Sequence, residues 1–467
     1  MFTCGEPSLD KLLGGIKEGT MIVILGHPGA GKTTFVAKLM YENMKSLVVR
    51  CLYVSFAETK EKFYENMSRL GMDFRTMESK GLFYFVQMPT VASEEIVEEL
   101  VKIITEYIEE KNVRIVVVDS ITPILKVLGS QKARATLHST LYSLTHMYNA
   151  LLILIADLPW GQETVDLGGI EFVADAVLVF KTRTERGLLS RWIEVRKFRG
   201  VRTPLAEIPF AIVEGIGLKV FPMLPPEEIP PLSLEKVYYT GCKIIDEAWG
   251  GIPRGATVSI VIPPIINIPS TLWLLIAATI IRNNLRAAFI SFELPSNAIL
   301  DALTKTADIF GLKSSRLVEN VSMLVSYNPT SHSMLELAGH IISHVERTTP
   351  DIVIMYGVDV LADLYDKRSF VHLLYNLTQY FRKMGITTIR VMRGAIKSTL
   401  LRNRMLVAFS DIIHNVVVER RRNEVRIKHV IWKSIPRYLT RMPIHEKPIT
   451  IYDSDVTRMC FSDKGMC

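Results

Sequence analysis

Cysteine is scarce in this sequence, and the few cysteines are scattered. Among 467 residues it occurs only at positions 4, 51, 242, 460 and 467, and no two of these form a Cys-x-x-Cys pair. An odd and dispersed set of cysteines argues against a disulfide-stabilised secreted scaffold and against a thiolate metal site. We therefore expect a protein of the reducing cytoplasm.

Long hydrophobic runs and dense basic clusters are missing as well. The most apolar helical segment, Leu272–Ile281, is about half as long as a membrane span, and Met1–Asp10 lacks the regions of a signal peptide. We expect no membrane association. The net charge of +7 permits a nucleic-acid partner without indicating one. Glutamine occurs only at positions 87, 131, 162 and 379, a composition that hints at a thermophile.

What the sequence does contain is the alternation typical of an α/β protein. Amphipathic segments such as Glu94–Lys111 separate short runs that are apolar on both faces, as buried parallel strands are. Alternating strands and helices predict a mainly parallel sheet covered by helices. The expected strands of the first half are residues 21–25, 52–56, 113–119, 151–156 and 176–180.

The chain divides near its middle, and its two halves repeat each other. Residues 222–235, PMLPPEEIPPLSLE, are too rich in proline to continue a helix or a central strand. Several residues recur at a constant spacing of 236, as Gly5 does with Gly241. Such a spacing predicts a tandem duplication. The predicted organisation is a domain at 1–221, a linker at 222–236, a second domain at 237–444 and a C-terminal tail at 445–467.

One motif in the first half indicates a specific chemistry. Residues 26–33, GHPGAGKT, fit G-x-x-x-x-G-K-[ST] between a predicted strand and a predicted helix. Backbone N–H groups of such a loop bind phosphate oxygens. We expect Lys32 to reach the β and γ phosphates of ATP and Thr33 to place its hydroxyl on Mg²⁺. The predicted nucleotide-binding residues are Gly26, His27, Pro28, Gly29, Ala30, Gly31, Lys32, Thr33 and Thr34.

Two carboxylates follow predicted strands at the same edge of the sheet. Asp119 ends an apolar strand and is the expected second magnesium residue, and the alternative is that it caps the next turn. Glu58 follows the strand at 52–56 and is the expected base that orients water. Because charged residues follow at 60–62, a solvated loop acid is the competing interpretation of Glu58.

A basic pair ends the motif WIEVRKFRG at residues 192–200. In a strand, Lys197 and Arg199 lie two residues apart and point to the same side. Two fixed cations would stabilise a transferring phosphoryl group, in the same chain or in a neighbouring subunit. The residue pattern alone equally predicts a basic edge strand that resists aggregation.

These motifs together resemble the KaiC-type ATPases of the RecA/RadA superfamily. The resemblance is carried by GEPSLD (5–10), LGGI (13–16), GHPGAGKTT (26–34), YVSFAET (53–59), VVDS (117–120), GIEFVADA (169–176) and KFRG (197–200). It implies two tandem RecA-like P-loop domains, each a mostly parallel sheet flanked by helices. It also implies ATP and Mg²⁺ at the subunit interfaces of a homo-oligomeric ring, usually a hexamer. Lys197 and Arg199 would reach the γ-phosphate of the next subunit.

The resemblance is incomplete at the catalytic acids and throughout the second half. The family's Phe-Glu-Glu pair is Phe56-Ala57-Glu58 here, so slow hydrolysis is expected. In the second half, prolines at 263, 264 and 269 remove N–H donors that phosphate would need. The altered positions are Asn267-Ile268-Pro269 opposite Gly31-Lys32-Thr33, Met355 or Tyr356 opposite Asp119, Leu294 opposite Glu58, and Ile431–Ser434 opposite Lys197–Gly200. We predict that the second domain does not bind ATP through a P-loop.

The favoured function is a regulatory or signalling ATPase with an unknown protein partner, in which the second domain is a scaffold or sensor. A recombinase-like DNA repair ATPase that binds single-stranded DNA is less favoured, because residues 126–134, where a DNA loop would lie, are weakly charged. A non-hydrolysing, ATP-dependent scaffold is the third hypothesis, since one catalytic acid is missing.

Overall fold

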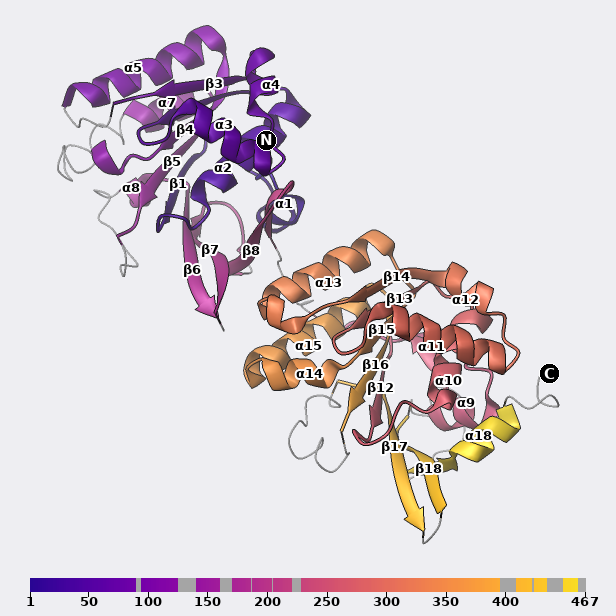
Figure 1. Cartoon of the computed structure of the whole chain (residues 1–467). Helices are drawn as coiled ribbons and strands as arrows, with labels where there is room; N and C mark the ends of the chain where they lie inside the picture. Colours follow the sequence, from indigo (N-terminus) through magenta and orange to yellow (C-terminus); the bar gives the residue numbers. More distant parts are fainter. Residues whose placement is uncertain are drawn as a thin grey trace. The chain divides into compact units, whose positions relative to one another are not determined.

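The computed structural model forms two compact units, Met1–Pro222 and Met223–Cys467 (Figure 1). The residues that it describes are 1–89, 94–124, 140–159, 170–185, 187–203, 205–220, 228–394, 409–421, 424–434 and 448–460. Within these ranges, no helix is both long enough and apolar enough to cross a membrane.

The first unit is built on one sheet, which has nine strands within the described residues. Their order is β3-β2-β4-β5-β1-β6-β7-β8-β9, parallel from β3 to β6 and antiparallel from β6 onward. The central strand β1, MIVILG, is buried along its whole length, as its apolar sequence requires. The strands are β1 Met21–Gly26, β2 Arg50–Ser55, β3 Phe83–Gln87, β4 Val113–Asp119, β5 Leu151–Asp157, β6 Ala176–Glu185, β7 Leu188–Phe198, β8 Glu207–Val213 and β9 Gly217–Val220.

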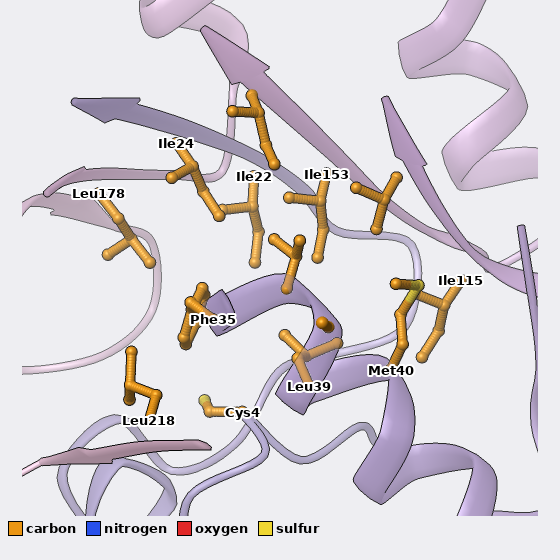
Figure 2. Close-up of a cluster of buried hydrophobic side chains, with 14 of the residues drawn as sticks. Cys4, Ile22, Ile24, Phe35, Leu39, Met40, Ile115, Ile153, Leu178 and Leu218 are labelled. Atoms are coloured by element: carbon orange, nitrogen blue, oxygen red, sulfur yellow. The ribbon is translucent and has the colours of Figure 1, made fainter. Parts of the chain in front are cut away.

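Helices cover both faces of this sheet. On one face, Phe35 and Leu39 of α2 lie in the same buried cluster as Ile22 and Ile153 of the central strands (Figure 2). On the other face, α5 contributes side chains such as Leu100 to a second cluster. The helices are α1 Pro7–Leu13, α2 Lys32–Leu47, α3 Lys60–Arg69, α4 Phe74–Ser79, α5 Glu94–Lys111, α7 Tyr142–Met147 and α8 Ile170–Val173.

The second unit has the same central strand order. Its main sheet runs β14-β13-β15-β16-β12-β17-β18-β19 within the described residues, and β14 to β18 correspond strand for strand to β3 to β7. It is parallel from β14 to β17 and antiparallel beyond. A small sheet joins β10 and β11. The strands are β10 Ser233–Tyr238, β11 Ile252–Arg254, β12 Thr257–Ile262, β13 Ala287–Ser291, β14 Val321–Ser326, β15 Ile352–Tyr356, β16 Thr387–Arg393, β17 Ile412–Arg421, β18 Glu424–Lys433 and β19 Ile449–Tyr452.

Two groups of helices enclose the second sheet. One buried cluster contains side chains of α9, α10, α11, α12 and α18, and the other contains side chains of α13, α14 and α15. The helices are α9 Lys243–Trp249, α10 Ser270–Arg282, α11 Ser296–Ile309, α12 Ser314–Asn320, α13 Met334–Thr348, α14 Val358–Leu364, α15 Lys367–Lys383 and α18 Asp453–Cys460, with a 3-10 turn at Pro329–Ser331.

The end of the described chain belongs to the second unit, which corrects the predicted C-terminal tail. The predicted tail starts at residue 445, but β19 extends the sheet beside β18, and Val456 of α18 is fully buried. A disulfide joins Cys242, at the start of α9, to Cys460, at the end of α18. The scattered cysteines argue against a disulfide framework, and they give no sign of this single long-range bond. These two cysteines lie 218 residues apart, so no local pattern marks them as a pair.

The predicted fold class is confirmed, since both units are mixed α/β layers with mainly parallel sheets flanked by helices. Each apolar run of the first half coincides with a strand, although β6 extends to Glu185. The extension pairs with β7 in a hairpin. Its residues, Lys181–Glu185, are polar and lie outside the buried core, so an apolar pattern does not predict them. Strand β10 begins at Ser233, inside the predicted linker, and residues 222–227 of that linker lie outside the described ranges.

Candidate functional site

The glycine-rich loop connects β1 to α2 at the carboxyl edge of the first sheet. Two positions of the loop favour glycine, one because a side chain would clash and the other because of its backbone conformation. A Cβ on Gly26 would approach the carbonyl oxygen of Phe180 to 2.5 Å, and Gly31 has a φ of 102° directly before the helix. No side chain caps α2, so the N–H groups of its first turn face the loop.

Lys32 places a buried positive charge beneath this loop. Its Nζ donates to the carbonyl oxygens of Gly26 at 2.8 Å and His27 at 3.0 Å, and it lies 2.9 Å from Oδ1 of Asp157. Asp157 ends β5 directly beside Gly26. It is not among the predicted site residues, because the predicted strand stops at Ala156. An acid directly after an apolar strand, the signal that identified Asp119, would have found it.

Asp119 connects the start of α2 to the neighbouring strand β2. Its Oδ2 accepts hydrogen bonds from Thr33 Oγ1 at 2.8 Å and from Tyr53 Oη at 2.5 Å. Burial raises the pKa of Asp119, and the hydrogen bonds from Tyr53 and Thr33 oppose this rise. Both of these partners are side chains of the site rather than N–H groups of the following turn.

Glu58 lies close enough to Asp119 for the two charges to interact. Its Oε1 accepts from Asn66 Nδ2 of α3 at 2.8 Å, and its N–H donates to Ser55 Oγ at 2.9 Å. Burial raises the pKa of Glu58, the Asn66 hydrogen bond opposes the rise, and the Asp119 charge adds to it. The carboxylate is therefore half-buried at the site rather than fully solvated.

Lys197 and Arg199 lie toward the opposite end of the sheet. Lys197 pairs with Val177 of β6, and Val177 pairs in turn with Val23 of β1. Val23 lies three residues before Gly26, the last residue of β1. At about 3.3 Å per residue, this offset is about 10 Å along the strands. Lys197 Nζ donates to the carbonyl oxygen of Phe172 at 2.8 Å, and Arg199 Nη2 contacts the same oxygen at 3.3 Å. The two cations share a contact, but they do not join Lys32 at the loop of their own chain.

The groups at the carboxyl edge suit a nucleotide with a magnesium ion. Mg²⁺ prefers oxygen ligands and uses few protein side chains besides phosphates and water, and Thr33 with Asp119 offers a hydroxyl and a carboxylate. Lys32 and the first turn of α2 would supply positive charge to phosphates bound there. Among the residues that the structure describes, no cluster of three or more His, Cys, Asp or Glu side chains fits a different metal site.

In the second unit, an arginine occupies the corresponding edge. Arg393 lies beside Ile262 of β12 as Asp157 lies beside Gly26 of β1. Its guanidinium donates to Glu293 Oε1 at 2.9 Å, to the Ile266 carbonyl oxygen at 3.0 Å and to Tyr356 Oη at 3.0 Å. A single side chain thus joins the loop after β12 to the ends of β13 and β15.

Strand register decides which residues of the two units correspond. Tyr356 pairs with Ser291 as Asp119 pairs with Ser55, so Tyr356 rather than Met355 replaces Asp119. Lys433 pairs with Ile413, in the place that Lys197 holds opposite Val177 in the first unit. The predicted alignment of KFRG with residues 431–434 is therefore wrong by two positions. A lysine persists there, and its Nζ donates to the Ser410 carbonyl oxygen at 2.5 Å.

The loop of the second unit also has a different local structure. Helix α10 begins only at Ser270, after Pro269, whereas the residue aligned with Lys32 is Ile268. Ile266 and Ile268 pack against the buried cluster of the second unit that contains side chains of α9 to α12 and α18. Apolar side chains and prolines thus take the place of the glycines and N–H donors of the first loop.

Substituting Arg393 with alanine should destabilise the second unit by about 1–3 kcal/mol, because three partners lose a charged hydrogen-bond donor and the site is only partly buried. Calorimetry of the full chain measures this, with Arg316→Ala on the exposed surface of α12 as the control. Equal melting of both variants and wild type would show that Arg393 does not hold the loop.

Comparison with known proteins points to one family for the first unit. The family model described as the KaiC ATPase matches residues 3–224. The circadian clock oscillator protein KaiC of Picosynechococcus is 25% identical over 245 residues, which cover 51% of this chain and 47% of that protein. KaiC of Synechococcus elongatus is 25% identical over 217 residues, covering 45% and 42%. A UPF0273 protein of Pyrococcus horikoshii is 27% identical over 232 residues, covering 47% of this chain and 92% of that protein.

The chain therefore spans about half the length of the KaiC proteins that it matches. Its two mainly parallel sheets, with a glycine-rich loop between β1 and α2 of the first, define the RecA-like class of α/β fold. Within this class, residues 3–224 are a KaiC-type ATPase domain.

Proposed function

We propose that the first unit binds MgATP at residues 26–34 and hydrolyses it slowly. The observation that supports this most is the convergence of Lys32, Thr33 and Asp119 at one edge of the sheet. In this proposal Lys32 exchanges carbonyl contacts for the β and γ phosphates, while Thr33 and Asp119 hold the metal side. Bound Mg²⁺ neutralises charge that develops on the transferring phosphoryl group.

Glu58 is the proposed base that orients the attacking water. Its raised pKa brings the carboxylate closer to the neutral range in which proton transfer is efficient. Ala57 stands where the resemblance implies a second acid, so a single carboxylate orients the water. This difference supports a slow rate, and it also supports the second candidate function, an ATP-dependent scaffold that hardly turns over.

Ring assembly is proposed from the position of Lys197 and Arg199. Both lie far from the loop of their own chain and bind the backbone carbonyl oxygen of Phe172, a residue whose side chain is exposed. A second subunit would bring such a pair to the ATP of its neighbour, as in the hexameric ring that the resemblance implies. Cations delivered in this way stabilise phosphoryl transfer.

The second unit is proposed to be a duplicated domain that serves as a scaffold or sensor for an unidentified protein partner. The shared strand order supports the duplication, and the Arg393 contacts support the loss of nucleotide binding. A cytoplasmic location in a thermophilic archaeon remains the proposal, because intracellular proteins of such organisms are rich in disulfides. Residues 126–134, on which the DNA hypothesis rests, lie outside the described residues.

The test is steady-state ATP hydrolysis per subunit at increasing protein concentration. The wild-type rate per subunit should rise with concentration and then level off, because each site is completed by a neighbour. Lys197→Ala should reduce the plateau by roughly tenfold or more. Lys102→Ala, in an exposed ion pair on α5, is the control and should match wild type. A rate independent of concentration and unaffected by Lys197→Ala would contradict the ring.

A further inference from the structure

Asp119 is held by a buried tyrosine as well as by the loop. Tyr53 lies on β2 with 1% of its surface exposed, and its Oη donates to the same carboxylate oxygen that Thr33 contacts. Its ring is packed by Phe63, with centroids 4.6 Å apart, and by Phe85, at 5.5 Å. A tyrosine hydroxyl is protonated at neutral pH, so Tyr53 is the donor of this hydrogen bond to the Asp119 carboxylate.

The second unit separates the role of the ring from that of the hydroxyl. Phe289 occupies the position of Tyr53, with the same pairing to the next strand, and it is equally buried at 1%. Tyr356 occupies the position of Asp119 in that unit. The second unit thus keeps the aromatic ring at this position, in Phe289. It lacks both the hydroxyl of Tyr53 and the carboxylate of Asp119. Packing requires the ring, and the carboxylate accounts for the hydroxyl.

We infer that Tyr53 is a positioning residue for the magnesium side of the site, where its hydroxyl fixes the rotation of the Asp119 carboxylate. The inference rests on the proposed function, because it assigns Asp119 to the metal. The ring contacts hold Tyr53 in one place, so the hydrogen bond gives Asp119 a rigid reference that solvent could not provide. A carboxylate without this bond would rotate among orientations of which few suit the metal.

The experiment compares wild type with Tyr53→Phe by calorimetric titration with ADP, once with Mg²⁺ and once with EDTA. The ratio of the two affinities isolates the metal-dependent part of binding. Loss of an outer hydrogen-bond partner of a metal residue lowers metal affinity about tenfold to a hundredfold, so Tyr53→Phe should lower this ratio by about tenfold or more. Affinity in EDTA should stay unchanged, because Lys32 and the loop are intact. Electron paramagnetic resonance of Mn²⁺ with ADP gives a second, direct readout of metal affinity.

Tyr64→Phe is the matched control, since Tyr64 packs on Phe63 in the same aromatic cluster but does not contact Asp119. It should leave the ratio unchanged. An unchanged ratio in Tyr53→Phe, or an equal fall with Mg²⁺ and with EDTA, would overturn the inference and leave the proposed function standing. A wild-type protein without affinity for ADP would overturn the proposed function, and this inference with it.

Discussion

Lys32→Ala should lower kcat/KM for ATP by at least about a hundredfold, the scale of losing one preorganised donor to a charged transition state. Lys32 is 6% exposed, and its ammonium lies among two carbonyl oxygens and Asp157. No other cation contacts these groups within the described residues, so none replaces the lost charge. The measurement is steady-state hydrolysis, accompanied by nucleotide titration.

A neighbouring lysine separates this effect from damage to α2. Lys38 lies six residues, about 1.7 turns, further along the same helix, and Lys38→Ala removes its ion pair with Glu42. It should keep wild-type hydrolysis while changing stability by well under about 1 kcal/mol. If Lys32→Ala retained turnover near wild type, the loop would not be the catalytic site.

Reducing the Cys242–Cys460 disulfide should destabilise the second unit by about 2–5 kcal/mol. The bond closes a very long loop, with 218 residues of sequence separation, and long loops gain most from cross-linking in the chain-entropy model. Helix α18 keeps other anchors, because Asp453 accepts hydrogen bonds from His429 at 2.9 Å and from Thr271. The unit should therefore melt earlier without losing its fold.

Calorimetry of the full chain with and without reductant measures this effect. The transition of the second unit should move, and that of the first should not, because its two described free cysteines, Cys4 and Cys51, are buried and unbonded to each other. Cys460→Ser should reproduce the shift without reductant. Identical melting under both conditions, with Cys242 reactive toward a thiol reagent, would show that the bond is absent in solution.

Local patterns predicted the parts of the fold that depend on local physics. Strands β1 and β4 follow directly from apolar runs, and the loop between β1 and α2 follows from its glycines and Lys32. Contacts between distant segments were not predictable in the same way. Asp157 meets Lys32, and Arg393 meets Glu293, only through the pairing of strands that lie far apart in sequence. No spacing in the chain encodes these pairs.

Corresponding positions of the two units show a second limit of sequence reasoning. A constant spacing of 236 residues points to Met355 as the partner of Asp119, yet strand pairing selects Tyr356. One residue of shift between β13 and β15 would turn the side chain to the other face of the sheet. Sequence alone left both residues open, and the register of the folded sheet was needed to choose between them.

In the proposed function, the chain retains nucleotide chemistry in its first unit only. The most direct test is the number of nucleotides bound per chain, measured by titration of the full-length protein with ADP and Mg²⁺. One nucleotide per chain in wild type, and none in Lys32→Ala, is the expected result. Two nucleotides per chain, or one that persists in Lys32→Ala, would place a working site in the second unit and contradict the proposed function.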